Sequence, residues 1–432
     1  MKIILTVIMA SLAIPAVLRA ADPRDVESFQ FVWETIRDKH WDLEGTGVDW
    51  QAVYNTYKPQ VEAAKSRYET RQLITKMLGE LGQSHFRILE EGSGRALEAL
   101  AARFPTGSGQ PGFKVGVIEG RVFIVKMDET SDAASKGLGL GAEILKLEQE
   151  DMREVVSQLE KAYENTSHSG LYMSRTLNGF FTGNIGSELQ LKVKMDNNIK
   201  EVTVNFEKPH GRFMPLLNLP SIYYDYQSQI LPNNIGYIYF NIFTLDSKMA
   251  FEKDLLGSLK NTDGLIIDMR GNPGGLGLTA VGFAGRLISE RGKRLGQMSN
   301  SGGTLNFAIF PQNPVYKKPV AILIDEGSAS TSEILAAGLQ DLKRARLFGS
   351  RSAGAALPSM IEDLPNGDRF QYAMADYISY NGRYLEGVGV LPDEVTPHSL
   401  ESMSRKEDAA CAAAVVWIVS QKKVTGAKNE SL

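Results

Sequence analysis

The stretch Val320-Ala-Ile-Leu-Ile-Asp-Glu-Gly-Ser-Ala-Ser-Thr-Ser-Glu-Ile-Leu335 decides the fold class of this chain. Its first five residues are all apolar, which is typical of a strand buried on both faces of a sheet. A serine-rich segment follows and opens a helix, which we expect over Ser332 to Leu342. A strand that gives way directly to a helix is the repeating element of α/β proteins. The stretch therefore predicts an α/β fold.

The same alternation extends over a large part of the chain, from Ile235 to Val395. The pattern predicts strands at Ile235 to Phe240, Gly264 to Asp268 and Val320 to Ile324, and helices at Ser247 to Leu259 and near Thr279 to Ile288. Continuous apolar strands of this kind indicate a sheet that is covered on both sides.

Two further regions precede the α/β part. From Asp25 to about Leu100, apolar residues recur at three- and four-residue spacing, which predicts helices. A Gly/Pro/Ser stretch between Gly107 and Gly112 indicates a linker. Beyond it the pattern predicts a compact β-rich module, with strands at Phe113 to Ile118, Arg121 to Met127, Gly141 to Leu147, Leu189 to Val193 and Glu201 to Phe206.

Composition excludes several classes of protein. The 432 residues are 43% hydrophobic and 23% charged, with a formal net charge of −4, so no basic surface is expected for nucleic acid. Cys411 is the only cysteine, which rules out an intramolecular disulfide. We expect neither a metal nor another cofactor, because His-Glu-x-x-His, the dinucleotide fingerprint and the P-loop are all missing from the sequence.

The first 20 residues are predicted to be a secretory signal peptide. Lys2 supplies a positive charge, Ile3 to Val17 is apolar, and small residues follow near Ala20. A membrane anchor is the alternative, but the apolar run is shorter than the roughly 20 residues of a spanning helix. We therefore expect a periplasmic or secreted protein that is not stably inserted in a membrane after signal cleavage.

Two glycine- and serine-rich junctions could carry chemistry. Ser330 stands where the strand gives way to the helix, and Asp268-Met-Arg-Gly-Asn-Pro-Gly-Gly275 follows another strand. Each has a plain structural alternative, a helix cap for the serine and a tight turn for the glycines. Together, however, backbone N–H groups near Gly275 and at Thr331 could converge on one oxygen, as an oxyanion hole requires.

A candidate general base lies far upstream, in Gln83-Ser-His85. Gly82 is expected to end a helix and Phe86 to Leu89 to form a short strand, so this segment lies at a rigid junction. Histidine titrates near neutrality and can accept a serine proton. The distance in sequence between His85 and Ser330 is no objection, because catalytic groups meet in space.

Three blocks then resemble the tail-specific (C-terminal processing) and tricorn protease family. They are Leu265-Ile-Ile-Asp-Met-Arg-Gly-Asn-Pro-Gly-Gly275, Gly327-Ser-Ala-Ser-Thr-Ser-Glu333 and Leu385-Glu-Gly-Val-Gly-Val-Leu-Pro-Asp393. The resemblance implies that Ser330 is the nucleophile and that the amides of Gly275 and Thr331 are the oxyanion donors. It also implies a crotonase-like protease core.

The family has two branches that differ in the base. One uses a serine–lysine dyad, but Ala355 stands in Gly349-Ser-Arg-Ser-Ala-Gly-Ala355 where that lysine would be. The tricorn-like branch uses serine, histidine, serine and glutamate. That resemblance assigns His85 as the base, Ser84 as the relay that holds its ring, and Glu386 as the carboxylate that orients the relay.

The β-rich module resembles the PDZ domain inserted in these proteases. Such domains bind chain ends by adding the peptide as a strand to the sheet edge; the alternative is a spacer. We thus expect a signal peptide over 1–20, a helical region over 22–106, a PDZ-like domain over 112–208, a protease core over 209–400, and a C-terminal helix and tail over 401–432.

These expectations combine into an exported serine endopeptidase. Its substrates would be peptides or the unfolded C-terminal regions of proteins, and it could form a homo-oligomer. A non-catalytic peptide- or ligand-binding protein on the same scaffold is the alternative, favoured by Ala355. An acyl-thioester enzyme is a third possibility, but coenzyme A is a cytoplasmic cofactor and the predicted signal peptide opposes it.

Overall fold

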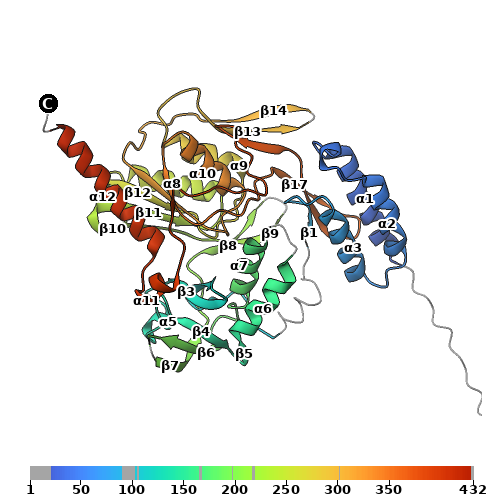
Figure 1. The fold of residues 1–432 in the computed structure, drawn as a ribbon, viewed down its shortest axis with the longest axis horizontal. Coiled ribbons are helices and arrows are strands. Elements are labelled where there is room, and N and C mark those ends of the chain that lie inside the picture. The colour runs from blue at the N-terminus through green and yellow to red at the C-terminus, as the bar shows by residue number, and fades with distance from the viewer. Residues whose placement is uncertain are drawn as a thin grey trace, which may run out of the picture.

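The computed structural model describes residues 21–89, 103–104, 107–164, 168–196, 198–216, 219–300 and 302–429. The predicted signal peptide lies outside the described residues. Figure 1 shows a helical region (blue) at one end of the molecule, a β-rich module (cyan to green) and a larger core to which both are attached. The α/β class predicted from the sequence is confirmed by alternating strands and helices in the core.

The helical region packs three helices around an aromatic core. These are α1 (Pro23–Lys39), α2 (Trp50–Glu62) and α3 (Arg67–Gly79), with the short η1 (Glu44–Thr46) between the first two. Strand β1 (Arg87–Leu89) follows and pairs with β18 (Arg369–Ala373) of the hairpin that β18 forms with β17 (Ser359–Asp363). This pairing fixes the segment just before β1, which carries Ser84 and His85, against the core.

The β-rich module is a sheet with three helices packed against it. Its strands are β2 (Phe113–Ile118), β3 (Arg121–Met127), β4 (Glu143–Leu147), β5 (Glu150–Asp151), β6 (Glu188–Met195) and β7 (Asn198–Asn205), in the sheet order β2-β3-β4-β6-β7, with β5 paired to β4. Its helices are α5 (Asp132–Ser135), α6 (Met152–Tyr163) and α7 (Ser169–Gly179). Strand β2 forms one edge, and α7 packs beside it.

The core is built on a six-stranded sheet with the order β10-β11-β12-β15-β16-β20. These strands are β10 (Tyr226–Leu231), β11 (Ile235–Phe240), β12 (Gly264–Asp268), β15 (Val320–Ile324), β16 (Arg346–Gly349) and β20 (Glu394–Val395). All neighbours are parallel except β10 and β11. The central strands β12 and β15 are buried on both faces, as their continuous apolar sequences predict, whereas the edge strand β10 is largely exposed.

Helices cover the two faces of this sheet. Alternate residues such as Ile322 and Ile324 pack on one side with α8 (Leu245–Leu256), α9 (Gly277–Gly285) and α10 (Thr331–Asp341). Ala321 and Leu323 point to the other side, against α12 (Ala409–Asn429). The remaining elements are β8 (Arg212–Leu216), β9 (Leu219–Tyr224), η2 (Pro232–Asn234), β13 (Arg294–Asn300), β14 (Gly303–Ala308), β19 (Asp376–Ser379) and α11 (Leu400–Ser404).

Candidate active site

Ser330 occupies a sharp turn between β15 and α10. Its φ is 56° and its ψ −116°, a conformation that non-glycine residues rarely adopt and that is found most often at functional sites. The backbone N–H of Ser330 donates to the carbonyl of Ala355 at 2.8 Å and to the Glu333 carboxylate at 3.1 Å. The turn is thus held by its backbone, and the serine remains partly exposed.

The glycine loop after β12 lies directly against this turn. A Cβ on Gly274 would come within 2.8 Å of the Ser330 Cβ and of the Thr331 nitrogen, so only glycine permits the approach. Thr331 Oγ1 donates to the carbonyl of Gly275 at 3.0 Å and ties the two loops together. No hydrogen-bond acceptor within the described ranges takes the backbone N–H of Gly275 or Thr331. Two free amides therefore lie beside the serine, and they could stabilise an oxyanion.

Ser84, His85 and Glu386 form one hydrogen-bonded relay. Ser84 donates twice to the Glu386 carboxylate, from its N–H at 2.6 Å and from its hydroxyl at 2.9 Å. The distance from Ser84 Oγ to His85 Nδ1 is 2.7 Å. Because the single hydroxyl proton goes to Glu386, His85 must donate its Nδ1–H to Ser84 Oγ. The neutral imidazole then keeps an unprotonated Nε2, the atom that a general base needs.

The surroundings keep this histidine neutral. Burial lowers the pKa of His85 to about 4; Glu386 opposes the shift, while the nearby cations, Arg87 first among them, reinforce it. For Glu386, burial acts to raise the pKa, but His168 and the two bonds from Ser84 outweigh it and leave that pKa below its ordinary value. At neutral pH the relay is therefore a neutral imidazole beside a carboxylate.

The segment Gly354–Ala356 joins the relay to the serine turn. Ala355 accepts the bond from Ser330 N–H, and the next residue, Ala356, donates its N–H to Glu386 at 3.1 Å. The buried Glu333 accepts from the amides of Gly354 and Ala355 at 2.8 and 2.9 Å, and thereby fixes this segment to the base of α10. Between the two described residues Ser330 and His85 themselves there is no hydrogen bond. The connection between the two halves of the site runs through backbone.

One residue near the site, His168, was missed by the analysis of the sequence. Its Nε2 lies 3.7 Å from Glu386 Oε1, and its side chain is only 4% exposed. A lone histidine outside the matching blocks gives no signal in the sequence, because its proximity to Glu386 depends on how the β-rich module docks on the core.

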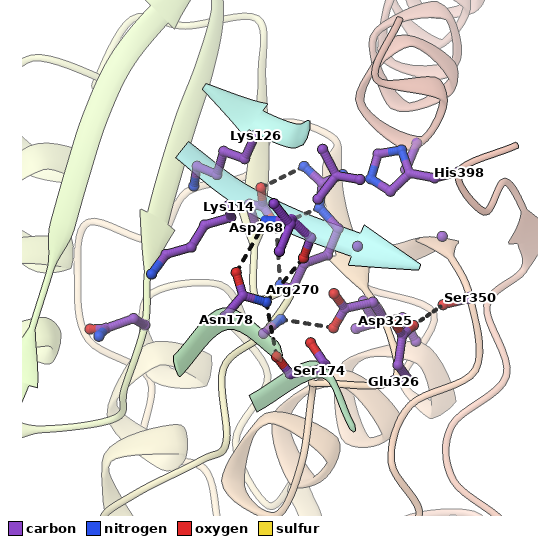
Figure 2. Close-up of a pocket in the computed structure, with 18 of the residues that line it drawn as sticks. Lys114, Lys126, Ser174, Asn178, Asp268, Arg270, Asp325, Glu326, Ser350 and His398 are labelled. Atoms are coloured by element: carbon purple, nitrogen blue, oxygen red, sulfur yellow. Dashed lines mark hydrogen bonds and ion pairs between the residues drawn. The ribbon is translucent and has the colours of Figure 1, made fainter. Parts of the chain in front are cut away.

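A cavity of about 430 Å³ lies between the β-rich module and the core, beside these loops. Figure 2 shows Lys114 and Lys126, direct partners on β2 and β3, reaching into it near Asp268 and Arg270. Lys126 Nζ lies 3.0 Å from the centre of the Tyr239 ring. Neither Ser330 nor His85 lines the cavity, which therefore lies beside the candidate site.

No group of three or more His, Cys, Asp or Glu in the described ranges is placed to hold a metal ion. Among the helices described, none combines the length and apolar character needed to cross a bilayer. The groups that the structure brings together at this site are hydroxyl, imidazole, carboxylate and backbone amide groups.

Comparison with known families gives two matches at separate places. The model of peptidase family S41 matches residues 234–396, which contain Ser330 and Glu386. A second model, the tricorn protease C1 domain, matches residues 26–79, the helices that precede Ser84 and His85. The first match contains the three blocks whose sequence resembled the tail-specific and tricorn proteases, and the second ends just before Ser84.

Individual relatives are similar at a lower level. A probable CtpA-like serine protease of Staphylococcus aureus is 28% identical over 218 residues, which are 49% of this chain and 40% of the relative's own length. This chain therefore covers less than half of that relative. The carboxyl-terminal-processing protease of Picosynechococcus is 26% identical over 337 residues, 77% of this chain and 74% of the relative.

Among solved structures, the photosystem II D1 C-terminal processing protease has a similar fold. The TM-score is 0.52 at 20% sequence identity, and the match covers 90% of this chain and 99% of that structure. At this level of identity the likeness concerns the fold alone. It extends over the helical region, the β-rich module and the core together.

Proposed function

We propose that this chain, whose residues 234–396 match the model of peptidase family S41, is an exported serine endopeptidase acting on peptides or the unfolded C-terminal regions of proteins. The single observation that carries the proposal is the relay from Glu386 through Ser84 to His85, next to a serine turn with two free amides. Export rests on the predicted signal peptide.

In the first step, Ser330 Oγ attacks the carbonyl carbon of the scissile peptide bond. His85 Nε2 takes the hydroxyl proton, and the Nδ1–H bond to Ser84 and the charge of Glu386 stabilise the imidazolium that forms. A modest approach of His85 to Ser330 on substrate binding accompanies this step, since catalytic hydrogen bonds often tighten only in the substrate complex.

The negative charge that develops on the carbonyl oxygen is stabilised by backbone. The N–H groups of Gly275 and Thr331 donate to this oxygen, and the positive end of α10 adds to the stabilisation. Loss of one such donor typically costs roughly 3–4 kcal/mol of transition-state stabilisation. His85 then protonates the leaving amine, and a water molecule, activated by the same histidine, hydrolyses the acyl-enzyme.

The cavity beside the site supports a role for the β-rich module in holding substrate. It is bordered by the edge strand β2 and by α7, the geometry by which PDZ-like domains add a peptide strand. Asn178 of α7 already engages the backbone of Val115, accepting from its N–H at 3.1 Å and donating to its carbonyl at 3.0 Å. A bound chain end pairs with β2 beyond Val115 or displaces this side chain.

Labelling with a fluorophosphonate tests the nucleophile and the base. The wild type should react at Ser330 and cleave an unfolded protein, whereas Ser330→Ala and His85→Ala should do neither while keeping the wild-type circular dichroism spectrum. Ser187→Ala and His210→Gln, changes of exposed residues in and beside the module, serve as controls that keep full activity. Full activity of Ser330→Ala or His85→Ala would refute the proposal.

A non-catalytic binding protein on the same scaffold is the second candidate. It is favoured by one observation, the lack of a hydrogen bond between Ser330 and His85. A wild-type protein that resists the fluorophosphonate, cleaves none of a peptide library and yet binds peptides would support this candidate over the peptidase.

A further inference from the structure

His168 connects the β-rich module to the relay of the proposed active site. It precedes α7, with a φ of 67°, and its Nδ1 lies 2.9 Å from the carbonyl of Ala353. The other ring nitrogen, Nε2, faces the Glu386 carboxylate at 3.7 Å, beyond hydrogen-bonding distance but close enough for a strong charge interaction. The ring thus spans from the Ala353 loop to the relay.

The hydrogen bonds determine which form of the ring suits this place. A carbonyl only accepts, so Nδ1 carries a proton that it donates to Ala353. In the neutral ring Nε2 would then direct a lone pair at a carboxylate, and it is buried with no hydrogen-bond partner in the described residues. Protonation of Nε2 turns this repulsion into an ion pair. The geometry therefore favours the imidazolium.

Apolar packing holds the same turn of α7 against the serine loops. Leu171 forms a small buried cluster with Ala329, Ala353 and Ala355, the residues next to Ser330 and in the segment that joins the serine turn to the relay. At Gly170, an added Cβ would meet the Glu326 side chain at 3.3 Å. The first turn of α7 is thus a close-packed contact between the module and the site.

We propose that His168 is a positioning residue: docking of the β-rich module brings its imidazolium against Glu386 and aligns the Glu386–Ser84–His85 relay. This inference rests on the peptidase function proposed above and adds a control on it. Without this cation, the Glu386 carboxylate is free to leave the orientation that Ser84 requires.

The charged groups around His168 give this control a pH dependence. Burial acts to lower the pKa of His168, but Glu386, the bond to the Ala353 carbonyl and, from α10, Glu333 together outweigh it. The pKa of His168 is therefore raised above 6.5. The neighbouring His85 is neutral at these pH values and adds no repulsion. A histidine with a raised pKa contributes its interaction fully below pH 6.5 and loses it as pH rises through the raised value. Activity should therefore fall on the alkaline side.

The test compares kcat and KM from pH 5 to 9, on an unfolded protein substrate, for the wild type, His168→Gln and His168→Lys. For His168→Gln we expect kcat to fall on the order of 100-fold near pH 6, the typical effect of a slightly misplaced catalytic group, with KM little changed and the alkaline limb lost. His168→Lys, which keeps a cation to higher pH, should retain more activity and move the alkaline limb upward. His210→Gln, the exposed histidine paired with Asp128, is the control and should match the wild type.

The outcomes separate this inference from the function on which it rests. A wild type that neither cleaves nor labels with fluorophosphonate overturns the peptidase itself. If the wild type is active and His168→Gln keeps its kcat and alkaline limb, the positioning role is wrong. Should His168→Gln fail to fold, His168→Lys decides: an alkaline limb identical to that of the wild type would overturn the proposal.

Discussion

Ser84 and Glu386 are 302 positions apart in the sequence, yet Ser84 gives both its backbone N–H and its hydroxyl to the Glu386 carboxylate, at 2.6 and 2.9 Å. One carboxylate therefore fixes the main chain and the side chain of the residue that precedes His85. The orientation of the imidazole is set by a contact between the helical region and the core, and not by the local sequence alone.

The Ser84→Ala variant separates these two bonds. The N–H bond to Glu386 remains, so the fold and the thermal midpoint should change little. His85 loses the acceptor for its Nδ1–H and its link to the carboxylate, and we expect kcat to fall by roughly 10²–10⁴, the typical contribution of general acid–base catalysis. Steady-state hydrolysis of an unfolded protein measures the effect, with Ser187→Ala as the matched surface change. Unchanged kcat would exclude the relay.

The acid limb of the pH profile should reflect the buried imidazole. Because burial lowers the pKa of His85 to about 4, the base stays neutral well below pH 6.5. We expect kcat/KM, which reports the free enzyme, to fall only as pH drops toward 4. The stability that comes from keeping this ring neutral is present above pH 6.5 and is lost as pH falls through the folded pKa. An acid limb centred near pH 6.5 would contradict this assignment.

A pair of glycine substitutions tests how closely the oxyanion loop approaches the serine. Gly274 and Gly367 have similar φ values, 97° and 91°. An added Cβ at position 274 would lie 2.8 Å from the Ser330 Cβ and the Thr331 nitrogen, whereas an added Cβ at position 367 would meet no atom within 4 Å. Both alanine variants should lose about 1–2 kcal/mol from the positive φ. Only Gly274→Ala should also lose activity, by on the order of 100-fold, through displacement of the catalytic atoms. Equal activity of the two variants would argue against this geometry.

Much of the core could be predicted from the sequence because each buried strand carries its own signal. The five apolar residues of β15 and the glycines after β12 identify the sheet and the loops at its edge without any knowledge of the rest. Ser84 and His85 are adjacent, so their pairing was also local. These features depend on short-range patterns, which a single sequence contains.

Contacts between distant segments lack such a signal. Glu386 was predicted through family resemblance, but the two bonds that hold it to Ser84 follow from the pairing of β1 with β18. His168 was assigned no function, because its place beside Glu386 depends on packing of α7 against three alanines. Alanine is common in any buried surface, and the sequence around His168 gives no indication of this docking.

Glu333→Gln should weaken the turn that carries Ser330. The carboxylate accepts four hydrogen bonds. Its Oε2 accepts from the backbone N–H groups of Ser330 and Ala355. Its Oε1 accepts from the Ser352 hydroxyl and the Gly354 N–H. A glutamine offers an oxygen on one side only and leaves two donors facing an NH₂ group. Each unpaired buried donor costs about 1–3 kcal/mol. Urea unfolding should show the loss, and kcat should fall with it.

The Glu333 carboxyl also has a shifted pKa, which gives its contribution to stability a pH dependence. Burial raises the pKa of this carboxyl to about 7 even though four donors act to lower it. Because the folded pKa lies above the unfolded one, wild-type stability should be greatest below pH 4.5 and should fall as pH rises through about 7, whereas the stability of the glutamine variant should not change over this range. A variant as stable and as active as the wild type would show that the four bonds do not hold the serine turn.

Arg270→Gln should be the most destabilising of these changes without touching the relay. The buried guanidinium bonds Asp268 at 2.9 and 2.7 Å and Asp408 at 2.8 and 2.7 Å, and so fastens the start of α12 to the end of β12. Removing it leaves two carboxylates in a buried site, at a typical cost of about 3–5 kcal/mol. Arg346→Gln is the matched control, because its pair with Glu394 is about 40% exposed on both sides and contributes at most about 1 kcal/mol.

The pKa of Asp268 predicts how the stability of the wild type and of Arg270→Gln depends on pH. Burial acts to raise the pKa of Asp268, but Arg270 outweighs burial and holds that pKa well below its ordinary value. In the wild type, the ion pair therefore stabilises the fold at pH values above the pKa of the unfolded state. This stabilisation is lost as pH falls through the pKa of the folded state. Without Arg270 the same burial raises the pKa, and mild acid should then stabilise the variant by protonating the carboxylate. Urea midpoints at pH 7 and pH 5 measure both effects. Equal destabilisation by Arg270→Gln and Arg346→Gln, or a loss of stability of Arg270→Gln at pH 5, would show that the buried network does not hold α12.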